Sequence, residues 1–166
     1  MLNRFDPLRK LMHADEAVAR FGARSGTVLT HGVFDLLTRA HVAFLAEARQ
    51  LGDRLVVAVH DDASARALQL VPLHPEGERA FQLAALESVD AVVSLGEPTP
   101  FALLVRLRPA VYVTRGEHAL DELAETALLR SWNGHAVALP FAEGVAPSLL
   151  ADHIRSALHT TLGARA

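Results

Sequence analysis

Short apolar segments alternate with amphipathic helical patterns along most of the chain, and this alternation constrains the fold more than any other feature. Each segment is rich in β-branched or aliphatic residues and apolar nearly throughout, which is typical of a strand covered on both faces. The predicted strands are TVLT (27–30), RLVVAVH (54–60), AVVSL (91–95), AVYVT (110–114) and AVALP (136–140). Strand–helix–strand alternation implies parallel pairing with right-handed crossovers. We therefore predict a single α/β domain with a doubly wound, five-stranded parallel sheet.

Helical periodicity occupies the intervals between these strands. We expect Gly52 to end the first helix and Pro100 to occupy the first helical position of the third. The predicted helices cover residues 40–52, 76–89, 99–108, 120–134 and 146–163. Residues 1–25 are predicted to form an N-terminal extension with a short helix, and residues 26–160 the domain itself.

Composition excludes several classes of protein. The 166 residues are 51% hydrophobic and 21% charged, as in a globular chain, and a net charge of −3 gives no electrostatic reason to expect nucleic acid as a partner. The absence of cysteine excludes disulfides and thiolate metal sites. The first residues carry scattered charges, whereas a secretory signal peptide needs an unbroken apolar stretch. No apolar run approaches the roughly 20 residues that span a bilayer. We expect a cytoplasmic protein with no membrane partner.

The turn after the first predicted strand lies in THGVFDLLTRAHVAFLAEA (30–48) and is suited to phosphate binding. Gly32 lets the backbone approach a ligand closely, the next helix directs free N–H groups at an anion, and His41 lies about one turn into that helix. The alternative is an ordinary strand–turn–helix junction in which Asp35 serves as a turn or capping residue.

Two other kinds of site are poorly supported. His60, Asp61 and Asp62 are adjacent on an extended segment, so their side chains point in opposite directions and make a poor metal site. Ser64 and Ser148 lack the sequence context of a hydrolase nucleophile.

The segment VLTHGVFDLLTRAHVAFLAEARQLGDRLVVAVHDDAS (28–64) resembles the opening of the cytidylyltransferase-like nucleotidyltransferases, and the resemblance continues through PEGERAFQ to RGEH (75–118). The heptose-phosphate adenylyltransferases and glycerol-phosphate cytidylyltransferases are the most similar branches. The resemblance implies a Rossmann-like domain that transfers AMP or CMP from ATP or CTP to a sugar-phosphate or polyol-phosphate acceptor and releases pyrophosphate. It also implies Mg²⁺ held mainly by the nucleotide phosphates, and a homodimer as one expected assembly.

The family pattern GxFDLLHxGHxxxLxxA matches here at Gly32, Phe34, Asp35 and His41. The resemblance implies roles for residues at corresponding positions and assigns no metal ligand to the protein. It implies catalytic roles for His41, Arg79 and Arg115, nucleotide binding by His31, Gly32, Val33, Phe34, Thr38, Gly116 and Ser148, and acceptor binding by Asp62.

The chain departs from that pattern at several phosphate-binding positions. Thr38 and Ala40 replace the first histidine and the glycine of HxGH, VTRGE (113–117) replaces VKGGD so that Thr114 takes the place of the lysine, and VAPS (145–148) replaces an RSTT-like stretch. Several cationic or protonatable side chains follow the predicted strands: His31, His41, His60, Arg79, Arg115 and His118. Two hypotheses follow, a divergent nucleotidyltransferase and a catalytically inactive relative that binds a nucleotide or a protein.

Overall fold

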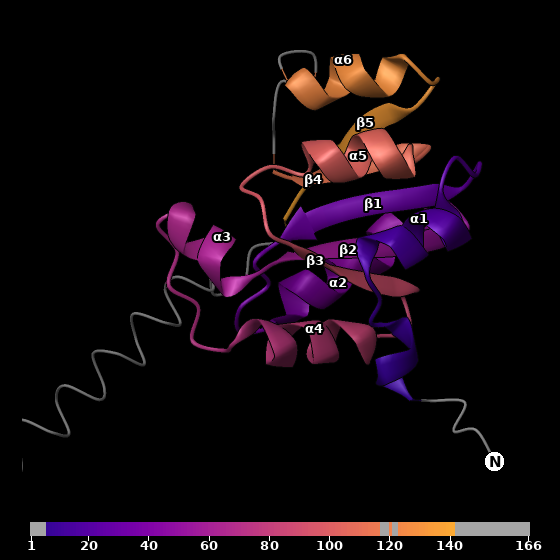
Figure 1. The fold of residues 1–166 in the computed structure, drawn as a ribbon. Helices are drawn as coiled ribbons and strands as arrows, with labels where there is room; N and C mark the ends of the chain where they lie inside the picture. The colour runs from indigo at the N-terminus through magenta and orange to yellow at the C-terminus, as the bar shows by residue number, and fades with distance from the viewer. Residues whose placement is uncertain (1–5, 117–119, 121–122, 142–166) are drawn as a thin grey trace, which may run out of the picture.

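A computed structural model shows five parallel strands in one sheet, and it describes residues 6–116, 120 and 123–141 (Figure 1). The strands are β1 (Thr27–Gly32), β2 (Arg54–His60), β3 (Ala91–Leu95), β4 (Val111–Arg115) and β5 (His135–Leu139). Their order in the sheet is β3-β2-β1-β4-β5, and every neighbouring pair is parallel. The predicted doubly wound, five-stranded parallel sheet is confirmed.

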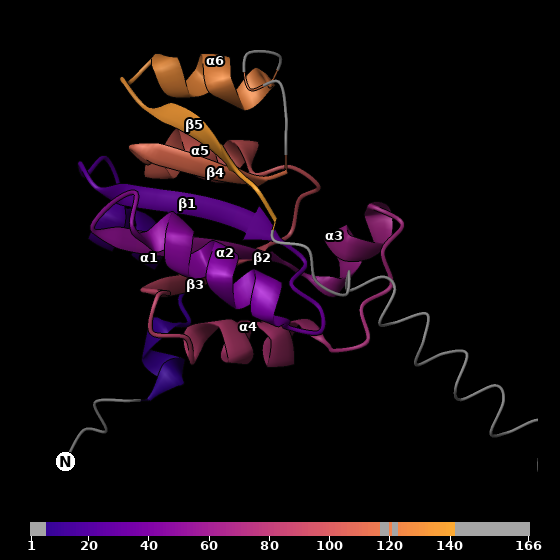
Figure 2. The ribbon, with the colours of Figure 1, turned by 180° about the vertical axis from the view of Figure 1, so that it is seen from behind.

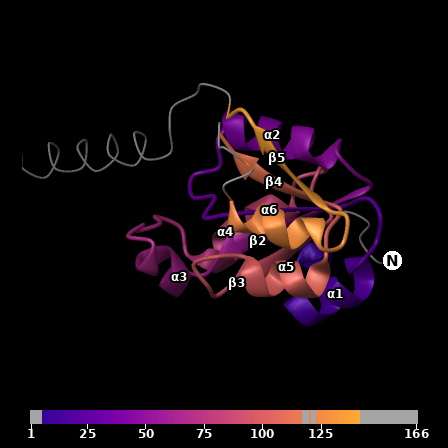
Figure 3. The same cartoon turned by 90° about the horizontal axis from the view of Figure 1, so that it is seen from above.

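Helices cover both faces of the sheet. The α2 (Arg39–Arg49) and α4 (Glu76–Ala84) helices lie on one face, and α1 (Ala14–Phe21), α5 (Phe101–Leu107) and α6 (Ala124–Arg130) lie on the other (Figures 2 and 3). The short α3 helix (Asp62–Ala67) follows β2 and lies beyond the carboxyl ends of the strands (Figure 1). The two faces therefore have separate hydrophobic cores.

The β2 strand shows why the predicted strands are apolar nearly throughout. Successive side chains point to opposite faces of a strand, so Val57 and Val59 enter the core beneath α2 and α4 while Val56 and Ala58 enter the core beneath α1 and α5. All four side chains are fully buried. A polar residue in the middle of β2 would have no exposed face to occupy.

The ends of several helices differ from the prediction. The α2 helix ends at Arg49, α4 ends at Ala84, and α6 is shorter than the predicted 120–134 at both ends. Pro100 is the residue before α5 rather than its first helical residue. The α3 helix was not predicted; it begins because the Asp61 side chain accepts a hydrogen bond from the Ser64 N–H, at 2.6 Å. The predicted helix 146–163 lies outside the described residues.

The segment before β1 packs on the sheet. A short 3-10 helix, η1 (Pro7–Lys10), precedes a backbone hydrogen bond of 3.1 Å from the Met12 N–H to the Val92 carbonyl, and Phe21 of α1 is buried against the α5 face. The domain boundary at residue 25 stays a prediction. No helix within the described ranges is long and apolar enough to cross a membrane.

The β1 strand lies at the centre of the sheet, with β2 on one side and β4 on the other. The chain reverses its direction of winding between β1 and β4. Ligands of open α/β sheets bind beyond the carboxyl ends of the strands at such a point. The loops that follow β1, β2 and β4 are therefore where the fold places a site.

Candidate active site

A cavity of about 630 Å³ lies at the carboxyl ends of β1, β2 and β4. Its polar and glycine lining residues are His31, Gly32, His60, Tyr112, Thr114, Arg115, Gly116 and Glu125. Apolar side chains complete the wall, with Phe141 next to the end of β5 and Leu68 and Leu70 in the loop after α3. The cavity brings together the predicted residues His31, Gly32, Val33, Arg115 and Gly116.

Arg115 is the positive charge of this cavity. Its guanidinium carbon lies 5.7 Å from the ring centre of Phe34 and 5.5 Å from that of Phe141, so two aromatic faces hold it in place. Burial lowers the pKa of Arg115, yet a guanidinium stays protonated at neutral pH. Among the described residues it has neither a carboxylate partner nor a hydrogen bond. A half-buried charge in this position favours the binding of an anion.

Two glycines form the cavity wall next to Arg115. A Cβ on Gly32 would lie 3.0 Å from the Phe34 ring and 3.4 Å from Arg115 Nη2, so a larger residue would force one of them to move. Gly116 has φ +87°, a conformation that other residues rarely adopt. Any side chain at either position would therefore crowd the cavity or strain its wall.

The turn after β1 contains two residues in the left-handed region, Phe34 with φ 52° and Leu36 with φ 49°. Such conformations cost free energy in residues other than glycine and persist where the surrounding structure requires them. Phe34 is 2% exposed and does not itself line the cavity, but its ring lies against the guanidinium of Arg115. The strained turn thus places an aromatic ring behind the charged group of the site.

His41 lies in the first turn of α2, is 1% exposed, and does not line the cavity. Its Nδ1 accepts a hydrogen bond of 3.2 Å from the Thr38 N–H and lies 3.0 Å from Thr38 Oγ1, in a capping-box arrangement. Because Nδ1 accepts, Nε2 carries the proton. Burial, and then the charge of Arg115, lower the pKa of His41 to about 4. His41 can therefore offer a neutral N–H donor, and the catalytic role implied for it stays a prediction.

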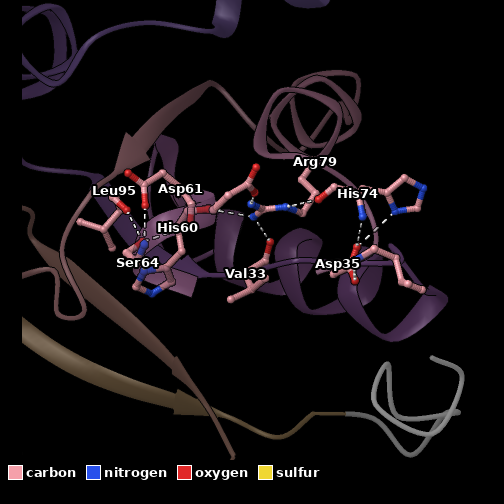
Figure 4. Close-up of polar contacts among 10 residues, drawn as sticks. Val33, Asp35, His60, Asp61, Ser64, His74, Arg79 and Leu95 are labelled. Carbon is pink, nitrogen blue, oxygen red and sulfur yellow. Dashed lines mark hydrogen bonds and ion pairs between the residues drawn. The ribbon is translucent and has the colours of Figure 1, made fainter. Parts of the chain in front are cut away.

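Arg79 has a fully buried side chain with four hydrogen bonds to the protein. It donates to the carbonyls of Val33 at 2.7 Å, His60 at 2.8 Å and His74 at 3.0 Å, and to the Asp62 carboxylate at 2.7 Å (Figure 4). The guanidinium joins the ends of β1 and β2 to α3 and to the loop before α4. Neither Arg79 nor Asp62 lines the cavity, so this geometry favours a positioning role, and their catalytic and acceptor-binding roles stay predictions.

Asp35 connects the turn after β1 to the same loop. Its carboxylate accepts hydrogen bonds from the N–H groups of Leu73 at 2.7 Å and His74 at 3.1 Å, and lies 3.2 Å from the His74 ring (Figure 4). Burial would raise the pKa of Asp35, but these bonds outweigh it and lower the pKa below its ordinary value. Of the two sequence interpretations, this geometry favours a structural residue.

Two histidines line the cavity on the side away from Arg115: His60 is buried and His31 is partly buried. Burial, and then the charges of His60 and Arg115, lower the pKa of His31 to about 4. Burial also lowers the pKa of His60, whose Nδ1 lies 3.2 Å from Ser64 Oγ. Both rings are neutral at pH 7, so they are hydrogen-bonding groups in this state of the protein rather than cations.

Sequence reasoning did not single out Tyr112, whose hydroxyl lies 2.8 Å from His31 Nδ1. Alternation in β4 could have found it, because Tyr112 and Thr114 share one face of a strand that ends at Arg115. Glu125 on α6 also lines the cavity and was not predicted, since its position depends on how α6 packs. His118 and Ser148 lie outside the described residues.

The described residues do not form a metal site of their own, because no group of three or more histidine or acidic side chains converges among them. Within the described cavity wall, Glu125 is the acidic side chain. A magnesium ion at this cavity would therefore take most of its ligands from water or from a phosphate compound.

Comparison with known proteins places this chain in a family. A profile described as "Cytidylyltransferase-like" matches residues 29–160, which include β2 to β5 and β1 except for its first two residues. The chain belongs to the cytidylyltransferase-like family. The chain is 51% identical over 117 residues to a D-beta-D-heptose 1-phosphate adenylyltransferase of Bordetella bronchiseptica, covering 69% of this chain and 72% of that protein.

A second relative is larger. The chain is 46% identical over 129 residues to the bifunctional protein HldE of Streptomyces coelicolor, which covers 76% of this chain but only 28% of that protein.

Solved structures support the cytidylyltransferase-like fold. A lipopolysaccharide core biosynthesis protein from Thermoplasma volcanium aligns with a TM-score of 0.62 at 24% identity, over 73% of this chain and 99% of that one. A pantothenate synthetase from Thermus thermophilus aligns with a TM-score of 0.54 at 16% identity, over 79% and 61%.

Proposed function

We propose that the protein is a nucleotidyltransferase that transfers AMP from ATP to a sugar phosphate and releases pyrophosphate. The observation that carries this proposal is the guanidinium of Arg115, which lies in a cavity at the switch point of the sheet without a counter-ion among the described residues. A triphosphate or a sugar phosphate supplies the missing negative charge. The name of the Bordetella relative supports ATP and a sugar 1-phosphate as the substrates.

In this proposal the residues bind and orient rather than form covalent bonds with the substrate. The acceptor phosphate attacks the α-phosphorus in line, and Arg115 neutralises negative charge on the phosphates. Gly32 and Gly116 let the phosphates approach the backbone, and His41 is available as a neutral donor if the ligand extends to α2. Magnesium bound to the nucleotide supplies further charge neutralisation.

A specific observation favours a second candidate, a nucleotide-binding protein without transferase activity. Thr114 stands at the position of the family's lysine, and the buried His41 is held by Thr38 away from the cavity wall. Removing one transition-state donor typically lowers kcat about 100- to 1,000-fold. Loss of the lysine and of an accessible histidine could therefore remove turnover while Arg115 still binds phosphate.

Pyrophosphate release distinguishes the two candidates. The wild type is incubated with magnesium and ATP or CTP, with and without a panel of sugar 1-phosphates, and binding is measured in parallel by calorimetry. The transferase proposal predicts acceptor-dependent release with ATP that Arg115→Gln abolishes and Arg115→Lys partly retains. ATP binding without release for any acceptor would favour the binding protein. Absence of both would contradict the proposal.

A further inference from the structure

The cavity wall has two chemically different sides, because β4 directs alternate side chains to opposite faces of the sheet. Arg115 points to the face of α2 and α4, where it meets Phe34 and Phe141. Tyr112 and Thr114 belong to the opposite face, on which α1, α5 and α6 pack. Among the described residues that line the cavity, the positive charge is therefore confined to one side.

The side opposite Arg115 carries an uncharged hydrogen-bond donor, the ring N–H of His31. A hydrogen bond to Tyr112 decides which ring nitrogen carries the proton. The Tyr112 hydroxyl has His31 Nδ1 as its hydrogen-bond partner among the described residues, at 2.8 Å, and burial keeps the phenol protonated by raising its pKa. We assign Tyr112 as the donor of this pair, because the buried phenol proton then has His31 Nδ1 as its acceptor. His31 Nδ1 thus accepts, Nε2 carries the imidazole proton, and this N–H has no described partner.

Thr114 and Glu125 add further groups without partners on this side. Within the described part of the chain, Thr114 Oγ1 is the buried side-chain polar atom that lacks a hydrogen bond. Glu125 lines the same cavity, and the described residues give its carboxylate no ion pair. An unpaired buried hydroxyl is costly. In this structure Thr114 Oγ1 is not exposed to the cavity that Thr114 lines, so a ligand reaches the hydroxyl after Thr114 rotates about its Cα–Cβ bond.

The N–H of His31, the hydroxyl of Thr114 and the carboxylate of Glu125 together suit a ligand that carries several hydroxyl groups. A sugar hydroxyl both donates and accepts, so it can pair with the His31 N–H, the Thr114 hydroxyl and the Glu125 carboxylate. A phosphate would be repelled by Glu125, and a purely apolar group would leave Thr114 unpaired. We propose that His31, Tyr112, Thr114 and Glu125 form a hydroxyl-binding group that holds a sugar whose phosphate is bound by Arg115.

This inference rests on the proposed function, since the phosphate at Arg115 places the sugar against the hydroxyl-binding group. The sugar can be the ribose of the nucleotide or the acceptor sugar, which share the chemistry of adjacent hydroxyls. Calorimetry with pairs of ligands separates them: ATP with 2′-deoxy-ATP and 3′-deoxy-ATP, and D-mannose 1-phosphate with 2-deoxy-D-glucose 1-phosphate. Tripolyphosphate serves as the ligand without hydroxyls.

The decisive variant is Thr114→Val, which removes the hydroxyl and keeps the shape. We expect it to weaken binding of the hydroxyl-bearing ligand about 2- to 10-fold, to abolish the preference over its deoxy analogue, and to leave tripolyphosphate binding unchanged. Its melting temperature should be equal to or higher than that of the wild type, since the lost hydroxyl had no partner. Thr114→Ser is the matched control and should retain the preference.

Tyr112→Phe provides a second test that keeps the ring in the core. It frees His31 Nδ1, so the imidazole proton is no longer directed to Nε2, and we expect a similar loss for the same ligand. If both variants bind every ligand as the wild type does while tripolyphosphate still depends on Arg115, the inference is overturned and the proposed function stands. If neither ATP nor tripolyphosphate binds to the wild type, the proposed function fails and this inference falls with it.

Discussion

The turn after β1 (33–41) and the end of β4 (112–116) meet at the carboxyl edge of the sheet and use their polar side chains differently. In the turn, His41 Nδ1 accepts a hydrogen bond from Thr38, and the Asp35 carboxylate accepts hydrogen bonds from the loop before α4. On β4, Arg115 and the Thr114 hydroxyl have no polar partner among the described residues.

The difference separates scaffold from binding surface. The turn contains the part of the family pattern that this chain retains best, yet its polar groups hold the backbone in place. The end of β4 departs from the pattern, yet it carries the groups that a ligand can satisfy. Residues that a motif brings to attention are therefore not always those with free hydrogen-bonding capacity in the folded protein.

The largest effect that would sharpen this comparison comes from Arg79→Met. This change leaves the carbonyls of Val33, His60 and His74 without their donor and the Asp62 carboxylate without its partner, and we expect a loss of about 3–5 kcal/mol of stability. Thermal unfolding followed by circular dichroism should show a melting temperature lower by roughly 10 °C. Arg66→Met, at an exposed position of α3, is the control. An unchanged melting temperature in Arg79→Met would show that Arg79 does not stabilise the fold.

The pH dependence of stability tests whether the site histidines are neutral. The pKa values of His31 and His41 are lowered to about 4, so between pH 4 and 6.5 the unfolded chain binds more protons than the folded one. Stability should therefore fall as the pH is lowered from 6.5 towards 4, by about 3 kcal/mol at most for each histidine. The lowered pKa of Asp35 acts below pH 4, outside this window.

Urea unfolding at pH 7.0 and pH 5.0 measures this dependence. His31→Asn, which can still accept the Tyr112 proton, should show a weaker dependence than the wild type, whereas His135→Gln at an exposed site should match it. A wild type equally stable at both pH values would mean that folding does not lower the pKa values of these histidines.

The smallest effect concerns the cap of α2. Thr38→Val removes the hydroxyl that lies 3.0 Å from His41 Nδ1, and we expect it to lower stability by about 1 kcal/mol without changing ATP affinity. Denaturation and calorimetry of the same preparations give both quantities, with Thr38→Ser as the control. A strong loss of ATP affinity in Thr38→Val alone would show that the turn still binds the nucleotide directly.

Much of the fold could be predicted from the sequence because buried parallel strands are apolar on both faces, and β2 leaves little room for another interpretation. The cap of α3 at Asp61 was missed because a single hydrogen bond determines it. In the site, the alignment of motifs selected Gly32 and Arg115, and both line the cavity, while the roles predicted for them stay predictions. It could not show that Arg79 is enclosed by three carbonyls, since that depends on where three separate loops meet.

Titration of ATP with magnesium into the wild type and Arg115→Gln tests the central claim most directly. The account predicts binding by the wild type and affinity lower by about 10- to 100-fold in the variant, because one charge-assisted contact to phosphate is lost. Equal affinities in the two proteins, with His41→Asn instead abolishing binding, would contradict it and place the phosphate at the turn after β1.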